Sequence, residues 1–297
     1  MLCFSFSTKR KIQIARAIHC IVRLTRRLFD KPMQGHFKRG GLQWDLNLNE
    51  GIDFSIWLLG AFEHDMLRVY SRLLKSGTCV LDIGANIGAH TLPLARLVGP
   101  NGCVVAIEGT AYAFEKLKAN LNLNPDYAPQ VIEKHALLVA ESGQSVTGSL
   151  HSSWPLTENS KAHPVLGGML KPLGEAQILT VDQLVKELDL PPIDWIKLDV
   201  DGNELSVLRG ARQTIARDRP HILLELAPYC HNPGQFAELI QWLITERYVL
   251  LRADNLKVLP HDAKEIIRHI PLNGSINAYA QPRSVKVNEN HGNKLKL

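Results

Sequence analysis

Acidic side chains follow three apolar segments that are typical of buried β-strands. Asp82 comes after Val80 and Leu81, Glu108 ends the segment 104–108, and Asp199 ends an apolar segment that begins at residue 193. The carboxyl ends of parallel strands meet at one edge of a sheet, where open α/β sheets bind their ligands. We therefore expect these three carboxylates to face a common ligand crevice.

The segment after Asp82 has the pattern D-x-G-x-N-x-G, with glycines at positions 84 and 88. Glycine lets the backbone approach a ligand closely and adopt positive φ. We expect a strand, a tight turn and a helix that starts near Asn86 and points free N–H groups into the same space. Asn86 and Ala89 stand where the dinucleotide pattern G-x-G-x-x-G needs glycine, and the G-K-[ST] of a phosphate-binding loop is absent.

The charge of Asp82 separates the cofactor classes. A carboxylate before the glycines repels a pyrophosphate and suits a cationic ligand, such as the amino group or the sulfonium of S-adenosyl-L-methionine. Glu108 can accept both ribose hydroxyls, which adenosine offers in either class, so it does not discriminate. A nicotinamide-dependent oxidoreductase and a non-catalytic cofactor-binding module at a membrane surface stay open as alternatives.

A second acidic group follows the segment that ends at Asp199, and it consists of Asp199, Asp201 and Glu204. These carboxylates are the candidates for the acceptor side of the crevice, either as a general base or as oxygen ligands of a divalent cation. The alternatives are hydrogen bonding within the loop and, for Glu204, a favourable position at a helix start. No dedicated metal site is assigned. We expect Lys197 to pair with a nearby acid, and Glu225 is a candidate for the acceptor pocket.

Three histidines stand near these segments, His90, His135 and His231. We expect each to be a structural or a surface histidine, and a catalytic base is the alternative.

The elements that must position these residues alternate between strand and helix periodicity, which predicts a mostly parallel sheet covered by helices on both faces. Strands are expected at 42–48, 80–83, 104–108, 130–137, 193–200, 222–226, 248–251 and 276–280. Helices are expected at 9–29, 54–75, from 86, at 111–122, after Thr180 as N-cap, at 203–216 and at 235–247. A break is expected from Gly35 to Gly41, and a long excursion with short hairpin strands at 141–176, a candidate substrate-facing segment.

The net charge of +5 over 297 residues is unevenly distributed. Residues 1–40 hold ten Lys and Arg and one acid, a net charge of +9, whereas the remaining 24 basic and 28 acidic residues give −4. A mildly acidic body argues against a nucleic-acid-binding protein. The basic amphipathic helix at 9–29 either packs on the body or contacts an anionic membrane surface peripherally.

Targeting signals are not recognisable in the sequence. No apolar run reaches the roughly 18 residues that span a bilayer, and no secretory signal is seen. The five scattered cysteines form no C-x-x-C pattern. We expect a cytoplasmic protein, peripheral to a membrane if the basic helix contacts lipid, with neither a disulfide framework nor a zinc site. The oligomeric state is left open.

Several segments together resemble the FkbM-type family of class I S-adenosylmethionine-dependent methyltransferases. The resemblance runs from about Trp44 to Pro282 and rests on residues 80–88, on Ala-Ile-Glu at 106–108 and on Thr-Val-Asp-Gln-Leu at 180–184. Its most specific part is Ile-Lys-Leu-Asp-Val-Asp-Gly-Asn-Glu at 196–204, followed by Val-Leu-Arg-Gly-Ala at 207–211.

The resemblance implies a Rossmann-like seven-stranded sheet of order 3-2-1-4-5-7-6 with an antiparallel seventh strand. It also implies O-methyl transfer to a hydroxyl of a sugar, polyketide or related metabolite. The family often has Pro where this chain has Gly109. Three parts are expected: a basic segment 1–41, a methyltransferase domain 42–283 and a polar tail 284–297. The expected cofactor-binding residues are Asp82, Gly84, Ala85, Asn86, Gly88, Glu108 and Gly109.

Overall fold

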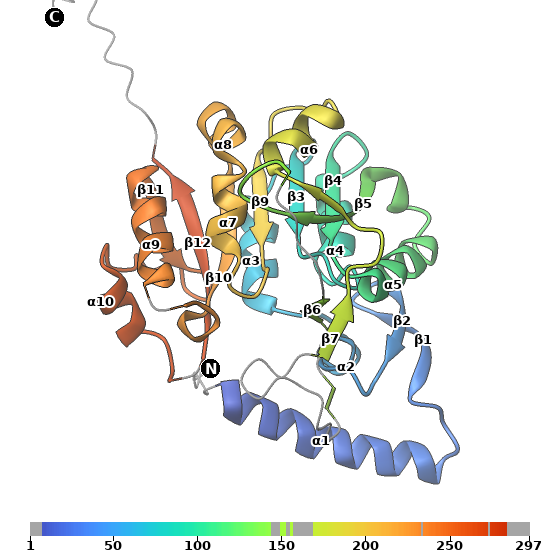
Figure 1. Ribbon diagram of the computed structural model, residues 1–297. Coiled ribbons are helices and arrows are strands. Elements are labelled where there is room, and N and C mark those ends of the chain that lie inside the picture. Colours follow the sequence, from blue (N-terminus) through green and yellow to red (C-terminus); the bar gives the residue numbers. More distant parts are fainter. Residues whose placement is uncertain are drawn as a thin grey trace, which may run out of the picture.

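The computed structural model describes residues 8–143, 149–152, 155–156, 169–232, 234–272 and 274–283. Its centre is an eight-stranded sheet, seen in Figure 1. The strands are β3 (Cys79–Ile83), β4 (Cys103–Glu108), β5 (Val131–Leu138), β8 (Gln177–Leu179), β9 (Trp195–Leu198), β10 (His221–Leu226), β11 (Tyr248–Arg252) and β12 (Ile276–Pro282). No helix within the described ranges is both long and apolar enough to cross a membrane.

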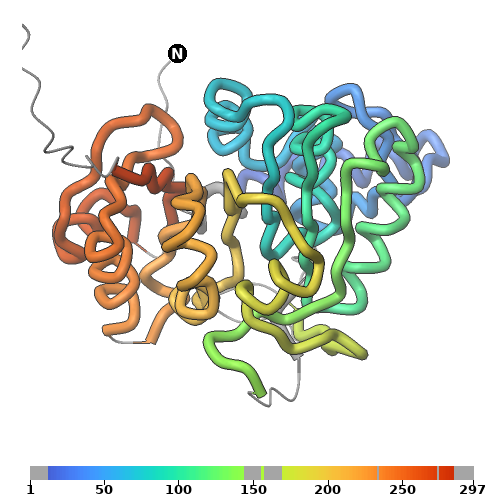
Figure 2. Tube along the Cα trace, turned by 90° about the horizontal axis from the view of Figure 1, so that it is seen from above, coloured from blue at the N-terminus to red at the C-terminus, as the bar shows by residue number. Residues whose placement is uncertain are grey.

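The strand order is β8-β5-β4-β3-β9-β10-β12-β11, read from one edge to the other. Without β8 it is the expected order 3-2-1-4-5-7-6, and β12 is antiparallel to both β10 and β11, so the predicted topology is confirmed. The additional strand β8 pairs in parallel with the end of β5. Figure 2 shows the same progression, from the orange and red C-terminal elements at one end to green segments at the other.

Helices cover both faces of the sheet because the strands alternate their apolar side chains. Val80 packs with α3 (His64–Leu73) and α4 (Thr91–Val98), whereas Leu81 and Ile83 pack with the helices of the opposite face. The remaining helices of the domain are α5 (Ala111–Asn122), α6 (Val181–Glu187), α7 (Glu204–Arg209), α8 (Arg212–Asp218), α9 (Gln235–Thr245) and α10 (Ala263–Arg268). Two short 3-10 helices lie at Ala128–Gln130 and Pro228–Cys230.

The N-terminal part is a helix and a hairpin attached to the body. Helix α1 (Thr8–Leu28) precedes β1 (Gln34–Arg39) and β2 (Leu42–Asn47), which pair antiparallel. The predicted break from Gly35 to Gly41 is wrong, because β1 runs through it and only Gly40 and Gly41 form the turn, both with positive φ. The predicted domain boundary after residue 41 falls in this turn.

Two predicted helices are each divided in the structure. The helix expected at 54–75 is α2 (Gly51–Leu59) and α3, separated at Gly60, which adopts φ 84°. The helix expected at 203–216 is α7 and α8, which are separated at Gly210 and Ala211. Gly210 packs closely on the chain, since a Cβ there would lie 2.2 Å from the carbonyl oxygen of Val139. Thr180 is the N-cap of α6, as predicted, in a capping box with Gln183.

The predicted excursion at 141–176 contains the antiparallel strands β6 (Ser149–Ser152) and β7 (Met169–Pro172). Much of this segment, and the whole predicted tail 284–297, lies outside the described residues. The four described cysteines, at positions 20, 79, 103 and 230, are free thiols.

Candidate functional site

The predicted crevice lies at the carboxyl ends of β3 and β9, where the strand order reverses. From β3 the chain proceeds to β4 and β5 on one side, and later from β9 to β10 on the other. Ligands of open α/β sheets bind at such a switch point. Asp82 and Lys197 occupy paired positions on the two strands.

Asp82 is fully buried beneath the glycine loop. Its Oδ2 accepts a 2.6 Å hydrogen bond from the hydroxyl of Thr91, and its Oδ1 lies 3.3 Å from the Nζ of Lys197. Both carboxylate oxygens therefore face protein groups. Asp82 affects the crevice through its charge and through the residues that it holds.

Lys197 is a buried cation at the centre of this edge. Its Nζ donates to the carbonyl oxygen of Gly84 at 2.6 Å and lies 3.8 Å from Asp199 Oδ2. Burial alone would lower the pKa of Lys197, but the charges of Asp82 and Asp199 outweigh it and hold that pKa above its ordinary value. The expected pairing of Lys197 with a nearby acid is therefore found with two acids.

The glycines of the loop are required by the protein itself. Gly84 has φ 76°, and a Cβ there would lie 1.9 Å from the carbonyl oxygen of Asp199. Gly88 has φ 89°, and a Cβ there would meet Leu117 Cδ1 at 2.9 Å. The fold alone explains these two glycines, so their presence is no independent sign of a ligand.

The helix after the loop begins at Thr91, five residues later than predicted. The prediction that a helix start near Asn86 points free N–H groups at a ligand is therefore wrong. The Asn86 N–H donates to Glu108 Oε2 at 2.9 Å, and the Ile87 N–H donates to the Asn86 side chain. The N–H groups of Gly84 and Ala85 both donate to Ile107.

Glu108 ties the ends of β3 and β4 together. Besides accepting from Asn86, it receives two hydrogen bonds at Oε1, from the Thr110 N–H at 2.8 Å and from the Thr110 hydroxyl at 2.7 Å. Oε2 thus keeps acceptor capacity for a ligand. Gly109, between these two residues, is half-buried.

Asp199, Asp201 and Glu225 converge on one point although they come from two strand ends. Each offers a carboxylate oxygen, and the three oxygens lie within 4.8 Å of one another. Burial raises the pKa of Asp201 to about 8, reinforced by the charges of Asp199 and Glu204. Burial also raises the pKa of Asp199 and Glu225. Such crowded oxygens favour a bound proton or cation, and their type would suit a hard divalent ion.

Glu204 lies beside this cluster but is buried. Its Oε1 accepts from the N–H groups of Val200 and Gly202, and its Oε2 lies 3.5 Å from His231 Nε2. Burial raises the pKa of Glu204 to about 7 and lowers the pKa of His231. Glu204 thus holds the loop 200–202 through hydrogen bonds and also lies next to the acidic cluster.

A polar network that the sequence did not reveal links α3, α4 and β12. Glu63 accepts from Asn277 Nδ2 at 3.0 Å and lies 3.0 Å from His90 Nε2. Burial would raise the pKa of Glu63, but the hydrogen bond and charge of His90 outweigh it and hold that pKa low. Glu63 and Asn277 both lie within the stretch from about Trp44 to Pro282 that resembles the family. His135 stacks on Phe114, and its backbone pairs with that of Glu108 in the sheet.

Two cavities in the described part of the chain lie at the glycine loop and at helix α1. A small one is lined by Asn86 and Ile87 from the glycine loop, by Asp53 from α2 and by Tyr112 and Lys116 from α5. A larger, open one of about 500 Å³ lies at the end of α1, away from the carboxylates.

Comparison with known proteins identifies matches of several kinds. The family model described as the methyltransferase FkbM domain matches residues 82–250. The chain is 28% identical over 193 residues to the AMB antimetabolite synthetase AmbE of Pseudomonas aeruginosa, an alignment that covers 53% of this chain and 9% of AmbE. It is 29% identical over 154 residues to the hexuronic acid methyltransferase AglP of Haloferax volcanii, covering 50% of this chain and 56% of AglP.

Among solved structures, the chain is similar to a methyltransferase FkbM from Methylobacillus flagellatus, with 18% identity and a TM-score of 0.46 over 74% of this chain and 48% of that one.

Proposed function

The chain belongs to the FkbM methyltransferase family, and we propose that it transfers a methyl group from S-adenosyl-L-methionine to a hydroxyl of a sugar, polyketide or related metabolite. The observation that carries this proposal is the cluster of carboxylates at the switch point. Seven carboxylates from five segments lie at this edge of the sheet, and the charges of three of them, Glu63, Asp82 and Asp199, act on the buried Lys197. The seven are Glu63, Asp82, Glu108, Asp199, Asp201, Glu204 and Glu225.

The chemistry of these carboxylate groups fits a positively charged ligand. When bound, S-adenosyl-L-methionine supplies a methyl group on a cationic sulfur, and surrounding carboxylates stabilise that charge. Glu108 would accept from the ribose hydroxyls through its remaining acceptor capacity. Gly84, Ala85, Asn86 and Gly88 shape the loop beside it, and Asp82 contributes its charge from beneath.

Asp201 is the residue that we assign as the general base. It is partly exposed, its backbone has φ 47°, and its carboxylate makes no hydrogen bond within the described part of the chain. Asp199, by contrast, is engaged by Lys197. Asp201 would accept the proton of the acceptor hydroxyl as the oxygen–methyl bond forms.

The charge of the crevice also bears on the acceptor. The carboxylates of the cluster repel an anionic substrate where they are ionised, so above about pH 8, the pKa of Asp201, a neutral hydroxyl compound is favoured over a uronate. The name of the Haloferax relative, hexuronic acid methyltransferase, makes the pair of a neutral sugar and the matching uronic acid a useful first comparison.

Calorimetry with S-adenosylhomocysteine and with NAD tests the cofactor. We expect binding of the first and none of the second; the reverse result would reject the proposal in favour of an oxidoreductase. Labelled-methyl transfer to a panel of hydroxylated glycans and polyketides tests catalysis. Binding of S-adenosylhomocysteine with no transfer to any member would favour a non-catalytic module.

A further inference from the structure

Helix α1 exposes an apolar stripe that the body does not cover. Its large side chains are between 45% and 79% exposed, with Leu24 at 69% and Leu28 at 79%. The stripe consists of Ile14, Ile21, Leu24, Leu28 and the following Phe29. Ile21, Leu24 and Leu28 lie seven, ten and fourteen residues after Ile14, which places all four on one side of the helix. Contiguous exposed apolar side chains mark an interaction surface.

The adjacent side of α1 already packs on the body. Ile18 and Val22 contact the core formed with β2 and α2, and the His19 ring meets Phe54 edge-on at 5.4 Å. Arg26 donates to the carbonyl oxygen of Pro32 and lies over the Trp57 ring. The helix is therefore fixed to the protein while its apolar stripe is presented outward.

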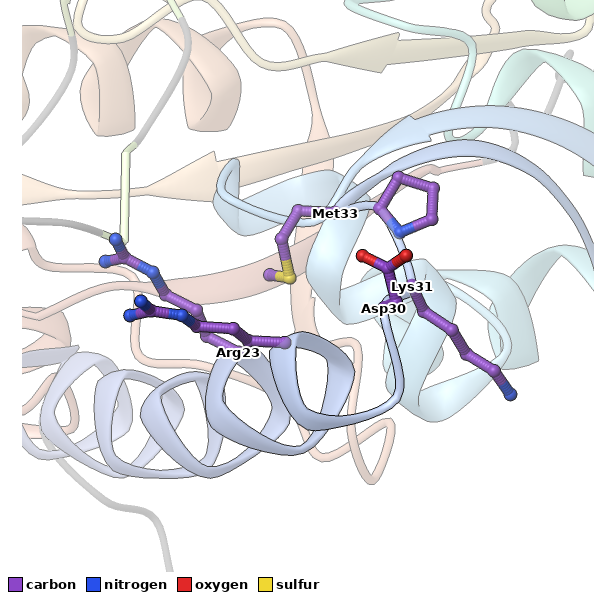
Figure 3. Close-up of a pocket in the computed structure, with 6 residues that line it drawn as sticks. Arg23, Asp30, Lys31 and Met33 are labelled. Atoms are coloured by element: carbon purple, nitrogen blue, oxygen red, sulfur yellow. The ribbon is translucent and has the colours of Figure 1, made fainter.

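Basic side chains flank this stripe. Arg16, Arg23 and Arg27 are exposed and form no ion pair with the described residues. Arg23, Arg27 and Lys31 line the open cavity of about 500 Å³ at the end of the helix, with Asp30 as its one acid. Figure 3 shows Arg23 and Lys31 on either side of Met33 and Asp30. The surface therefore combines exposed apolar side chains with an excess of positive charge.

We propose that α1 docks the protein on an anionic lipid bilayer. The apolar stripe would enter the boundary between headgroups and acyl chains, and the flanking arginines would contact lipid phosphates. Charge complementarity favours this occupant: residues 1–40 carry +9, whereas the rest of the chain carries −4 and would itself be repelled by anionic lipid. The inference does not depend on the methyl-transfer proposal.

Vesicle co-sedimentation of the full chain tests this inference. We expect binding to phosphatidylcholine vesicles that contain about 30% phosphatidylserine, little binding to phosphatidylcholine alone, and weaker binding as salt screens the attraction. The double variant R23E/R27E should lower the partition coefficient at least about tenfold. The variant L24S/L28S, on the apolar stripe, should lower it similarly.

The control is K186E/R212E, which reverses two exposed charges on α6 and α8, at the end of the molecule opposite α1 in Figure 1. It should bind like the unaltered protein. Unchanged melting temperatures and circular dichroism spectra establish that the variants fold. The inference is overturned if the unaltered protein does not bind the vesicles, or if the control variant loses as much binding as the α1 variants. It is also overturned if α1 binds another protein while the full chain binds no vesicles.

Discussion

The carbonyl oxygen of Asp199 occupies the place where Gly84 would carry a side chain, and a Cβ there would lie 1.9 Å from it. The two residues come from the ends of β3 and β9, on either side of the switch point. Lys197 binds the carbonyl oxygen of Gly84 from the same strand as Asp199. The glycine loop and the acidic loop are therefore one packed unit.

Gly84→Ala should destabilise the protein far more than Gly88→Ala. Both positions have positive φ, which costs an alanine about 1–2 kcal/mol. At Gly88 the added Cβ meets the movable end of Leu117, whereas at Gly84 it meets backbone, so we expect a total of roughly 3 kcal/mol or more there. Urea unfolding of the two variants measures the difference. An equal or larger loss in Gly88→Ala would contradict the packing described here.

Lys197→Met should destabilise the fold by about 3–5 kcal/mol, because it leaves Asp82 buried without its cation. The double variant D82N/K197M should lose less than the sum of the two single variants. Lys134→Met is the control, since Lys134 pairs with Glu187 at the surface and should cost at most about 1 kcal/mol. Additive losses in the double variant would show that the two buried groups do not interact.

Glu108→Gln should weaken S-adenosylhomocysteine binding roughly tenfold to a hundredfold, the effect of losing a hydrogen bond to a charged group. Isothermal titration calorimetry measures it. Thr110→Val removes the hydroxyl that bonds Glu108 but keeps the carboxylate, so its affinity should stay close to the original. If both variants bind equally well, Glu108 does not contact the cofactor.

Asp201→Asn should lower kcat by about 10²–10⁴-fold while S-adenosylhomocysteine affinity is retained. A general base acts in its deprotonated form, and burial raises the pKa of Asp201 to about 8. The kcat of the unaltered protein should therefore rise with pH and level off above about pH 8, and this dependence should vanish in the variant. Asp126→Asn, at an exposed turn, should retain the original profile. The same pH profile in Asp201→Asn would assign the base elsewhere.

Glu204→Gln should change how stability depends on pH. Burial raises the pKa of Glu204 from 4.5 to about 7, so between these values the folded state holds a proton that the unfolded state has released. Stability from this group is complete at low pH and is lost as pH rises toward 7, by up to roughly 3 kcal/mol. Urea unfolding at pH 5 and pH 8 should show the variant gaining on the unaltered protein by about that amount. A constant difference would mean that Glu204 titrates normally.

The strand order was predictable because each buried strand has its own apolar segment and the resemblance supplied the topology. What local patterns missed depends on distant partners. The break between α2 and α3 places Glu63 beside His90 and Asn277. Asn277 lies more than two hundred residues after Glu63 in the sequence. Helix α4 does not start at Asn86, where φ is 51° and the N–H binds Glu108, 22 residues later. β8 has only three residues, too few for a recognisable period.

For the site, the residue types located the crevice but not the bonds within it. Asp82 was expected to face a ligand and instead is bonded to Thr91 and Lys197. The two segments at 180–184 and 207–211, noted only for the resemblance, meet in the structure. The N–H of Asp182 donates to the carbonyl oxygen of Gly210. The Asp182 carboxylate accepts from the N–H groups of Gln213 and Thr214 at the start of α8. Local sequence patterns could not predict these hydrogen bonds, because the partners lie about thirty residues apart in the sequence.

The pairing of β3 with β9 also sets the order in which the chain can fold. Lys197 leaves the ribosome 115 residues after Asp82, whereas β4 and β5 follow β3 closely and can pair with it earlier. Until β9 arrives, β3 is the edge of a partial sheet, and Asp82 is an unneutralised charge on it. A charge on an open edge discourages pairing with other chains. The same carboxylate that is buried beside Lys197 in the folded protein is thus a charge on the open edge of β3 for as long as β9 is missing.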